Sequence, residues 1–292
     1  RTRGLKPSPV RRGRATGDNA PGMPPQPPLP VLHVDDAFAI VDKPAGLMAH
    51  DSALARGETD FAADRLREQF GKPIFLVHRL DRATSGCLLL AFDRDTASAL
   101  GKALMARDVE KDYLAVCRGW PAQERFAIDH PLDGGPGKPQ KKPALTEFER
   151  LATCELDLPS AGFATSRYAL LRARPQTGRF RQIRRHLKHA SHHLIGDTSH
   201  GDGRHNRQFR MLGIHRMLLH AERLAFAHPD DGRRVVGGDV AALEVHAAAA
   251  RVDDAEMVLR MVLLPAPLPP STVAILPSMT ERLTPRRACT GP

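Results

Sequence analysis

Residues 74–92 read IFLV-HRLDRATSG-CLLLAF, two apolar runs on either side of a short polar segment. The runs have the length of β-strands, and the second is apolar throughout, as expected for a strand buried on both faces. A loop between two core strands is a rigid place from which to present a side chain. Asp81 is the only carboxylate of this loop, and Arg79 and Arg82 flank it. We therefore predict a fixed aspartate that stays ionised, because nearby cations favour its charged form.

An ionised aspartate held in this way suits nucleophilic attack or general base catalysis. The structural alternative is an aspartate that caps a turn and pairs with one of the neighbouring arginines. The loop alone leaves both interpretations open, and the rest of the chain supplies the arguments.

The surrounding pattern mixes many short strands with few helices. Helical spacing of apolar residues predicts helices at 59–70, 94–107 and 178–190, the first capped by Thr59. Alternating or continuous apolar runs predict strands at 31–34, 38–41, 87–92, 113–117, 146–151, 167–173 and 217–226. Because strands outnumber helices and the connections are often short, we predict an α+β fold with a mixed, mainly antiparallel sheet and flanking helices.

The two ends of the chain differ in composition from the middle. Residues 21–30, PGMPPQPPLP, do not favour a helix because proline lacks the amide donor. We predict a disordered basic, proline-rich extension at 1–30, a catalytic domain at 31–264 and a disordered tail at 265–292. Met23 lies just before the first predicted strand, and we infer a start of translation near it, with residues 1–22 as an upstream extension.

The chain carries a formal net charge of +10, and the positive charge is concentrated in one segment. Residues 172–223 contain twelve basic and three acidic residues, a net charge of +9. A concentrated cationic face favours a polyanionic partner. A solvated basic surface would give the same composition.

Other patterns argue against several classes of protein. The four cysteines form no C-x-x-C pair, so we expect a reducing compartment and neither a disulfide framework nor a cysteine zinc site. Eight of the fourteen histidines lie in residues 186–220, but no carboxylate or cysteine beside them supplies a natural further zinc ligand. We therefore predict no metal and assign these histidines to the surface that faces the polyanionic partner. No run of about 18 apolar residues predicts a membrane helix, and we expect a cytoplasmic protein.

Several blocks of the chain together resemble the RluA family of pseudouridine synthases. Residues 78–86 resemble its H-R-L-D-x-x-T-S-G signature, and residues 41–46 (VDKPAG) resemble its V-N-K-P-x-G turn, with Asp42 where asparagine is usual. Further blocks follow in the family's order: KDYLAV at 111–116, TGRFRQIRRHL at 177–187, IGD at 195–197 and LLHA at 218–221. The resemblance spans about residues 31–240. It implies the family's catalytic fold and its reaction, the isomerisation of uridine to pseudouridine in RNA without a cofactor.

This resemblance implies roles for three residues. Asp81 corresponds to the catalytic aspartate, Tyr113 to the active-site tyrosine, and Arg184 to the arginine that pairs with the aspartate. The reaction breaks the uracil–ribose bond, turns the base and joins C5 to C1′, so one carboxylate suffices. Asp81 either attacks C1′ or removes a ribose proton to give a glycal, and both routes stay open. The ring of Tyr113 suits stacking on the loose uracil, while the alternative is a strand-edge tyrosine with a solvated hydroxyl.

Five cationic residues are predicted to bind RNA: Arg79, Lys111, Arg181, Arg185 and Lys188. By resemblance, Arg79 helps to displace the flipped base, with a structural pairing to Asp81 as the alternative. In the predicted helix at 178–190, Phe180, Ile183 and Leu187 form an apolar stripe, and the cations lie on another face. Arg181 stands where the family usually has histidine.

A finer resemblance concerns the substrate. Residues 195–207, the arginines at 184–185 and residues 213–221 resemble the family's tRNA subgroup TruC, whose target is uridine 65 in the T stem of some tRNAs. The resemblance implies tRNA as the partner and no obligate protein partner. Two alternatives stay open: the same enzyme class acting on rRNA, and a non-catalytic RNA-binding protein. The complete set of Asp81, Tyr113 and Arg184 argues against the second alternative.

Overall fold

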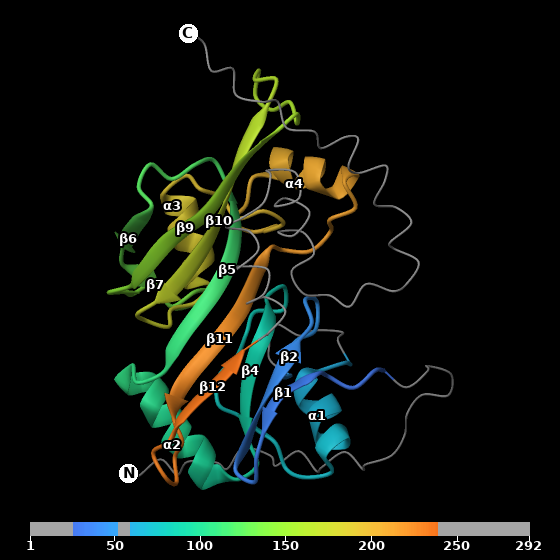
Figure 1. Cartoon of the computed structure of the whole chain (residues 1–292), viewed down its shortest axis with the longest axis vertical. Helices are drawn as coiled ribbons and strands as arrows, with labels where there is room; N and C mark the ends of the chain where they lie inside the picture. The colour runs from blue at the N-terminus through green and yellow to red at the C-terminus, as the bar shows by residue number, and fades with distance from the viewer. Residues whose placement is uncertain (1–25, 52–58, 239–292) are drawn as a thin grey trace, which may run out of the picture.

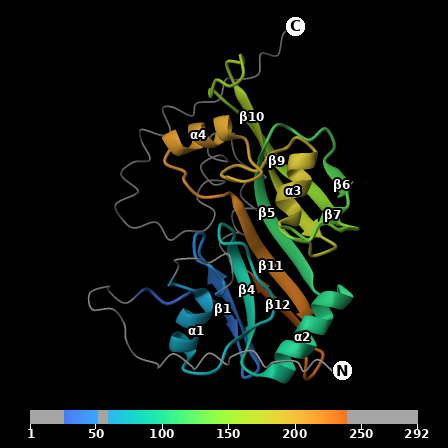
Figure 2. The same ribbon diagram turned by 180° about the vertical axis from the view of Figure 1, so that it is seen from behind.

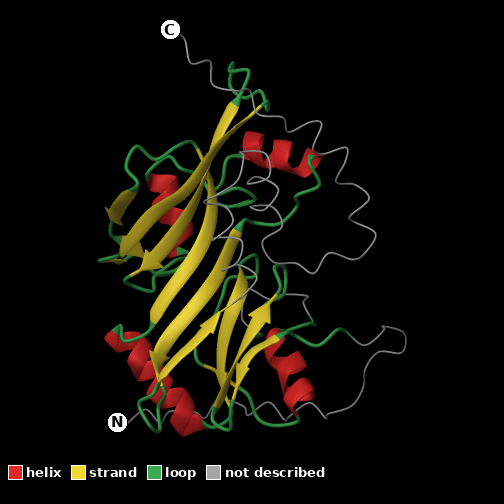
Figure 3. Ribbon diagram, viewed as in Figure 1, coloured by secondary structure: helices red, strands yellow, loops and turns green. Residues whose placement is uncertain are grey.

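The structure, a computed structural model, describes residues 26–51 and 59–238, and its centre is one large β-sheet (Figure 1, Figure 3). Eight strands follow each other across this sheet in the order β1-β2-β4-β11-β5-β10-β9-β6, while β3 pairs with β4 and β12 with β11. Their bounds are β1 Val31–Val34, β2 Phe38–Lys43, β3 Phe75–Leu76, β4 Ser85–Ala91, β5 Glu110–Arg118, β6 Arg125–Asp129, β9 Leu145–Leu156, β10 Ser166–Pro175, β11 Leu219–Ala227 and β12 Arg234–Gly238. A separate short hairpin joins β7 (Leu132–Asp133) to β8 (Lys141–Lys142).

Neighbouring strands of the sheet run antiparallel except at its middle, where β4 and β11 pair in parallel. Gly86 makes this pairing close, because it lies in register with Ala221 and has a φ of +105°. A Cβ at Gly86 would lie 2.2 Å from the carbonyl oxygen of Ala221. Glycine is therefore required by the close approach of two backbones as well as by its dihedral angle.

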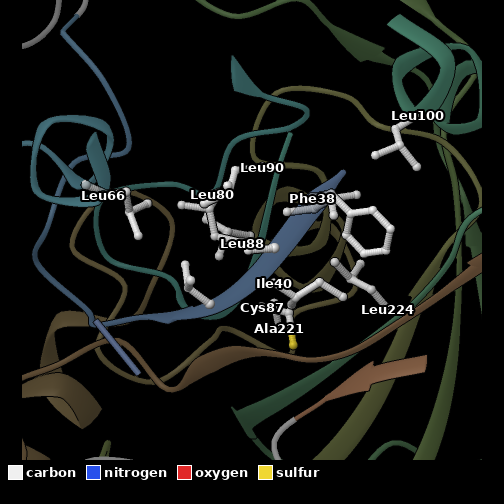
Figure 4. Packing of buried hydrophobic residues seen from close by; sticks show 14 of the residues in the cluster. Phe38, Ile40, Leu66, Leu80, Cys87, Leu88, Leu90, Leu100, Ala221 and Leu224 are labelled. Atoms are coloured by element: carbon white, nitrogen blue, oxygen red, sulfur yellow. The ribbon is translucent and has the colours of Figure 1, made fainter. Parts of the chain in front are cut away.

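Four helices flank the described part of the sheet: α1 Ala62–Phe70, α2 Arg94–Ala106, α3 Gln182–His189 and α4 Gly203–Met211. Helix α2 begins after Asp93, whose side chain accepts a 2.8 Å hydrogen bond from the backbone N–H of Thr96. Such a cap satisfies one of the free N–H groups of the first turn. Leu66 of α1 and Leu100 of α2 pack in one cluster with the strand residues Phe38 and Leu88 (Figure 4).

Helices α3 and α4 pack on opposite faces of the sheet. Phe209 of α4 joins a cluster that contains Leu114 and Leu170, while Leu187 of α3 joins one that contains Ala115 and Leu171. Consecutive strand residues point to opposite faces, so these two clusters lie on the two sides of β5 and β10. Helix α3 is behind β9 and β10 in Figure 1 and in front of them in the reverse view of Figure 2.

This architecture confirms the predicted α+β fold with a mixed, mainly antiparallel sheet. All seven predicted strands are present, and five of the seven are longer than the pattern indicated. Two predicted helix starts are wrong. Helix α1 begins at Ala62 without a side-chain cap, so Thr59 is not its N-cap, and α3 begins at Gln182 instead of 178.

Residues 178–181 form a turn before α3, and the predicted apolar stripe is shorter as a result. Ile183 and Leu187 are buried, whereas Phe180 precedes the helix and lies at the edge of a pocket. Arg181 ends the turn with a φ of +50°, in the left-handed region that only a few non-glycine residues adopt. This backbone turn directs the first residues of α3 toward the pocket described below.

The predicted domain boundaries at residues 30 and 265 stay predictions, since residues 1–25 and 239–292 lie outside the described residues. Leu29 belongs to the segment predicted to be disordered, yet it is buried. Its backbone N–H and C=O both pair with the side-chain amide of Gln69 in α1, at 2.8 and 2.9 Å. Within the described residues, no helix is long and apolar enough to cross a membrane.

Replacing Gly86 with alanine tests the close approach of β4 and β11. We expect Gly86→Ala to lower the free energy of unfolding by more than about 3 kcal/mol, since it adds a backbone clash to the cost of a positive φ. Gly213→Ala is the matched control, because Gly213 has a φ of +85° with no atom within 4 Å of the added Cβ. It should cost only about 1 kcal/mol. Urea unfolding of both variants measures the difference, and equal losses would contradict the close approach.

Candidate active site

The loop of residues 78–84 is held in place by contacts at both of its ends. The Nε2 atom of His78 accepts a 3.0 Å hydrogen bond from the backbone N–H of Leu89 in β4. Burial, followed by the nearby charge of Lys111, lowers the pKa of His78 to about 4, so its ring is neutral at pH 7. The backbone N–H of Thr84 donates to the carbonyl oxygen of Asp81 at 3.0 Å, which closes the loop as a turn.

A second segment of the chain, residues 43–47, is hydrogen-bonded to this loop. Gly46 and Arg82 exchange two hydrogen bonds: the Gly46 N–H donates to the Arg82 carbonyl at 2.8 Å, and the Arg82 Nε donates to the Gly46 carbonyl at 2.9 Å. The fully buried ammonium of Lys43 donates to three carbonyl oxygens, those of Pro44, Leu47 and Arg82. Two motifs that are separate in the sequence therefore form one rigid support for Asp81.

Asp81 meets an arginine from the opposite side of the site. The Nη1 atom of Arg184 in α3 donates to the Asp81 carboxylate at 2.6 Å, while its Nε and Nη2 atoms donate to both oxygens of Asp197 at 2.7 and 2.8 Å. Asp197 and Arg184 have almost no exposed side-chain surface, whereas 30% of the Asp81 side chain is exposed. One guanidinium thus joins a buried carboxylate to a carboxylate that reaches solvent.

Asp197 is itself held by its own loop. The backbone N–H groups of Ser199 and His200 donate to its Oδ1 atom at 2.8 and 2.9 Å. Burial alone would raise the pKa of Asp197, but the hydrogen bonds and charge of Arg184 and these two N–H groups bring it below its usual value. Asp197 therefore stays ionised and fixes the orientation of Arg184.

Tyr113 lies beside the aspartate loop because of the register of three strands. Ala221 of β11 pairs with Gly86 on one side and with Tyr113 of β5 on the other. Burial, with smaller contributions from Cys87 and Asp81, raises the pKa of Tyr113 well above its usual value. Its hydroxyl is therefore protonated at neutral pH, and its half-buried ring faces the same pocket as Asp81.

That pocket has a volume of about 730 Å³, and Asp81 is the only carboxylate among its described lining residues. Seven cationic side chains line it: Arg79, Lys111, Lys138, Lys142, Arg179, Arg181 and Arg184. A cavity with one carboxylate and many cations suits an anionic ligand that also presents a neutral reacting group.

The structure brings most of the predicted site residues together. Asp81, Tyr113 and Arg184 line the pocket, and so do the predicted RNA-binding residues Arg79, Lys111 and Arg181. Arg185 and Lys188 do not line it. Lys188 is exposed on α3, and Arg185 pairs with Asp133 at 2.7 Å.

The arginine that pairs with Asp81 is Arg184, as the resemblance implied. Arg82, which follows Asp81 in the sequence, donates its Nε hydrogen to the carbonyl oxygen of Gly46. Four residues of the site were not singled out from the sequence: Asp197, Lys138, Lys142 and Arg179. The IGD block drew attention to Asp197 without a role, and the lysines lie in a glycine- and proline-rich loop with no periodic pattern.

The histidine-rich segment does not form a cluster suited to a metal. Among the described residues, no group of three or more His, Cys, Asp or Glu side chains is placed to hold an ion. His186, predicted to face RNA, is fully buried, where its ring nitrogens pair with the Thr146 hydroxyl at 2.9 Å and the His130 carbonyl at 3.1 Å. The prediction of an RNA-facing side chain is therefore wrong for this histidine.

A family model described as RNA pseudouridylate synthase matches residues 37–189, which include Asp81, Tyr113 and Arg184. The chain belongs to the RNA pseudouridylate synthase family. It is 40% identical over 217 residues to tRNA pseudouridine synthase C of Vibrio parahaemolyticus, covering 71% of this chain and 88% of that protein. It is 37% identical over 218 residues to the protein of the same name from Salmonella typhimurium, covering 71% of this chain and 84% of that protein.

Solved structures agree on the fold. Human RNA pseudouridylate synthase domain containing 1 aligns with a TM-score of 0.58 at 23% identity, covering 84% of this chain and all of that one. Human RNA pseudouridylate synthase domain containing 4 aligns with a TM-score of 0.54 at 22% identity, covering 72% and 87%. The chain is therefore a pseudouridine synthase, an isomerase of the RluA family similar to tRNA pseudouridine synthase C.

Replacing Asp197 with asparagine tests how Arg184 is held. Folding lowers the pKa of Asp197, so its contribution to stability is complete above the unfolded value of about 3.9 and is lost as the pH falls through the lower folded value. Asp197→Asn should cost about 3 kcal/mol at pH 7 and flatten the loss of stability at acid pH.

Denaturant unfolding of both proteins between about pH 2 and pH 7 measures this. Asp36→Asn, at an exposed position in the turn between β1 and β2, is the control and should leave the curve nearly unchanged. If the free energy of unfolding falls equally steeply with decreasing pH in Asp197→Asn and in the parent, the lowered pKa of Asp197 would be contradicted.

Proposed function

We propose that this chain isomerises a uridine in tRNA to pseudouridine, with Asp81 as the catalytic group. The observation that carries the proposal is the ion pair of Asp81 with Arg184 at the edge of a cationic pocket in which it is the only carboxylate among the described lining residues. The pairing orients the carboxylate and leaves part of it open to a ligand. The membership of the family and the names of the relatives support the same activity.

The reaction needs one carboxylate and no net change of atoms. The bond between N1 of uracil and C1′ of ribose breaks, the base turns, and a new bond joins C5 to C1′, after which the proton on C5 moves to N1. Asp81 either attacks C1′ and later leaves as the new bond forms, or takes a ribose proton and returns it. Both routes use the carboxylate of Asp81. Arg184 keeps that carboxylate oriented, since its other donors are fixed by Asp197.

Tyr113 contributes in two ways to this proposed mechanism. Its ring lies in the wall of the pocket, where an aromatic face stacks on a uracil that has left the RNA helix. Because the pKa of its hydroxyl is raised, the group donates a hydrogen bond at neutral pH rather than acting alone as a base. Removal of the C5 proton through Tyr113 therefore requires a second group, and Asp81 is the only carboxylate among the described lining residues.

The substrate has to be turned out of its helix before it reaches Asp81. Extrusion of a stacked nucleotide costs a few kcal/mol, and contacts to the flanking backbone offset this cost. Arg79 is exposed, lines the pocket and lies two positions before Asp81 in the same loop, which supports the role that the resemblance implies for it, filling the space left by the base.

tRNA is the substrate that the comparisons favour. The relatives at 37–41% identity carry the name tRNA pseudouridine synthase C, and the resemblance of residues 195–207 points to uridine 65 of the T stem. We expect the protein to act in the cytoplasm, where this substrate is found. rRNA is the second candidate within the same reaction class.

Substitution of the aspartate tests the catalytic proposal. Asp81→Asn removes the charge while keeping the shape, so product formation should fall at least about a thousandfold with little loss of RNA binding. Release of tritium from RNA labelled at C5 of uridine measures the reaction, and filter binding measures the complex. Asp108→Asn, at an exposed position outside the pocket, is the control and should keep full activity. Normal tritium release by Asp81→Asn would refute the role.

Mapping of the modified position tests the substrate. Unmodified transcripts of tRNA and of rRNA are incubated with the protein, and pseudouridine is located by chemical derivatisation followed by reverse transcription. We expect one modified uridine in the T stem of tRNA and none in rRNA. Modification of rRNA alone would favour the second candidate. Modification of neither, by a folded protein, would favour the non-catalytic RNA-binding alternative.

A further inference from the structure

The turn between β7 and β8 forms one wall of the pocket and carries lysines that pair with no acidic side chain of the described residues. Lys138 and Lys142 line the pocket and are exposed, and within the described part of the chain neither takes part in an ion pair. Lys141 lies next to Lys142 on β8 but is not part of the lining. Adjacent strand residues point to opposite sides, so Lys142 faces the pocket and Lys141 faces away from it.

This wall is held rigidly at its base by Arg185. The Nη2 atom of Arg185 donates to the Asp133 carboxylate at 2.7 Å, and its Nη1 atom donates to the Asp133 carbonyl at 3.0 Å. The other oxygen of Asp133 accepts a 2.9 Å hydrogen bond from the N–H of Gly135. These contacts fasten the start of the turn to helix α3, which also carries Arg184.

The turn itself is closed and packed. Gly134 and Lys138 are joined by a 3.0 Å backbone hydrogen bond, and the ring of Phe180 lies so close to Gly135 that an added Cβ would come within 2.7 Å of it. The Nε atom of Arg179 donates to the carbonyl oxygen of Pro143, just after β8, at 3.0 Å. Lysines on a pre-ordered turn bind a ligand without the entropic cost of ordering the backbone.

We propose that the β7–β8 turn is a phosphate-binding wall, in which Lys138 and Lys142 bind the RNA backbone beside the extruded uridine and Arg185 positions the turn. This inference rests on the proposed RNA substrate. The occupant follows from chemistry: a nucleotide whose base reaches Asp81 carries its flanking phosphates on the rim, where unneutralised ammonium groups attract them. Arg185, predicted from the sequence to bind RNA, acts through the turn because its donors are used by Asp133.

The lysines are tested with the full chain carrying Asp81→Asn, so that binding is measured without turnover. Lys138→Ala with Lys142→Ala should weaken binding of an unmodified tRNA transcript about tenfold or more at low salt, and should reduce the slope of log affinity against log salt by between about 1 and 2. Lys141→Ala with Lys102→Ala removes the same charge from β8 and from the exposed face of α2, outside the pocket lining, and should change both quantities far less.

The active chain separates the failure of this inference from the failure of the proposed function. In the parent with Asp81 intact, loss of the two lysines should raise KM more than it lowers kcat, because the lysines contact the backbone and not the reacting atoms. If the parent is active but Lys138→Ala with Lys142→Ala leaves the slope of log affinity against log salt unchanged, the phosphate-binding wall is overturned and the proposed function is not. A folded parent that neither binds nor modifies RNA would overturn the proposed function.

The role of Arg185 is tested by combining substitutions. If Arg185 acts through the turn, Arg185→Ala alone should weaken tRNA binding, but should add less than about twofold in the chain that already lacks both lysines. Asp133→Asn should also weaken tRNA binding, because it breaks the ion pair with Arg185 that holds the turn and removes no cation. Fully additive losses would show direct contact of Arg185 with RNA and overturn its positioning role. Denaturant midpoints of both variants identify any loss that comes from unfolding.

Discussion

The guanidinium of Arg184, shared between Asp81 and Asp197, is the interaction on which the site depends. It joins a loop before β4, helix α3 and the turn after Ile195, and the residues at its two ends are 103 and 13 positions away in the sequence. A buried guanidinium with only one partner would be costly, and a lone Asp81 would be free to turn. Asp197 neutralises the cation and fixes its plane, so the orientation of Asp81 depends on a buried carboxylate outside the pocket lining.

The centre of the sheet imposes the second constraint. Gly86, Ala221 and Tyr113 lie in register on three adjacent strands, so a single strand, β11, separates the end of the aspartate loop from the strand of the tyrosine. A side chain at Gly86 would push β4 away from β11 and so move Asp81 relative to Tyr113. The close parallel pairing of β4 and β11 thus sets the distance between Asp81 and Tyr113, which both face the pocket.

Much of this arrangement could be predicted from the sequence, and the exceptions have physical reasons. Apolar runs are local, so the strands around Asp81 were predicted correctly, and the family's blocks identified Arg184 as its partner. The start of α3 was predicted too early because Arg181 adopts a positive φ, and an arginine in the sequence gives no sign of such a conformation. Arg185 has the spacing of a surface cation, and only the tertiary fold reveals Asp133 beside it.

The order in which distant segments meet also bears on how the protein folds. Ser85 and His220, 135 residues apart, form a buried 3.0 Å hydrogen bond across the parallel pair, and the chain between them supplies β5, β9 and β10. Such long loops must close before their contacts are gained, which gives a high contact order and slow folding. Catalytic competence therefore arises late, because a nascent chain whose β11 segment is still inside the ribosome lacks the strand that lies between β4 and β5.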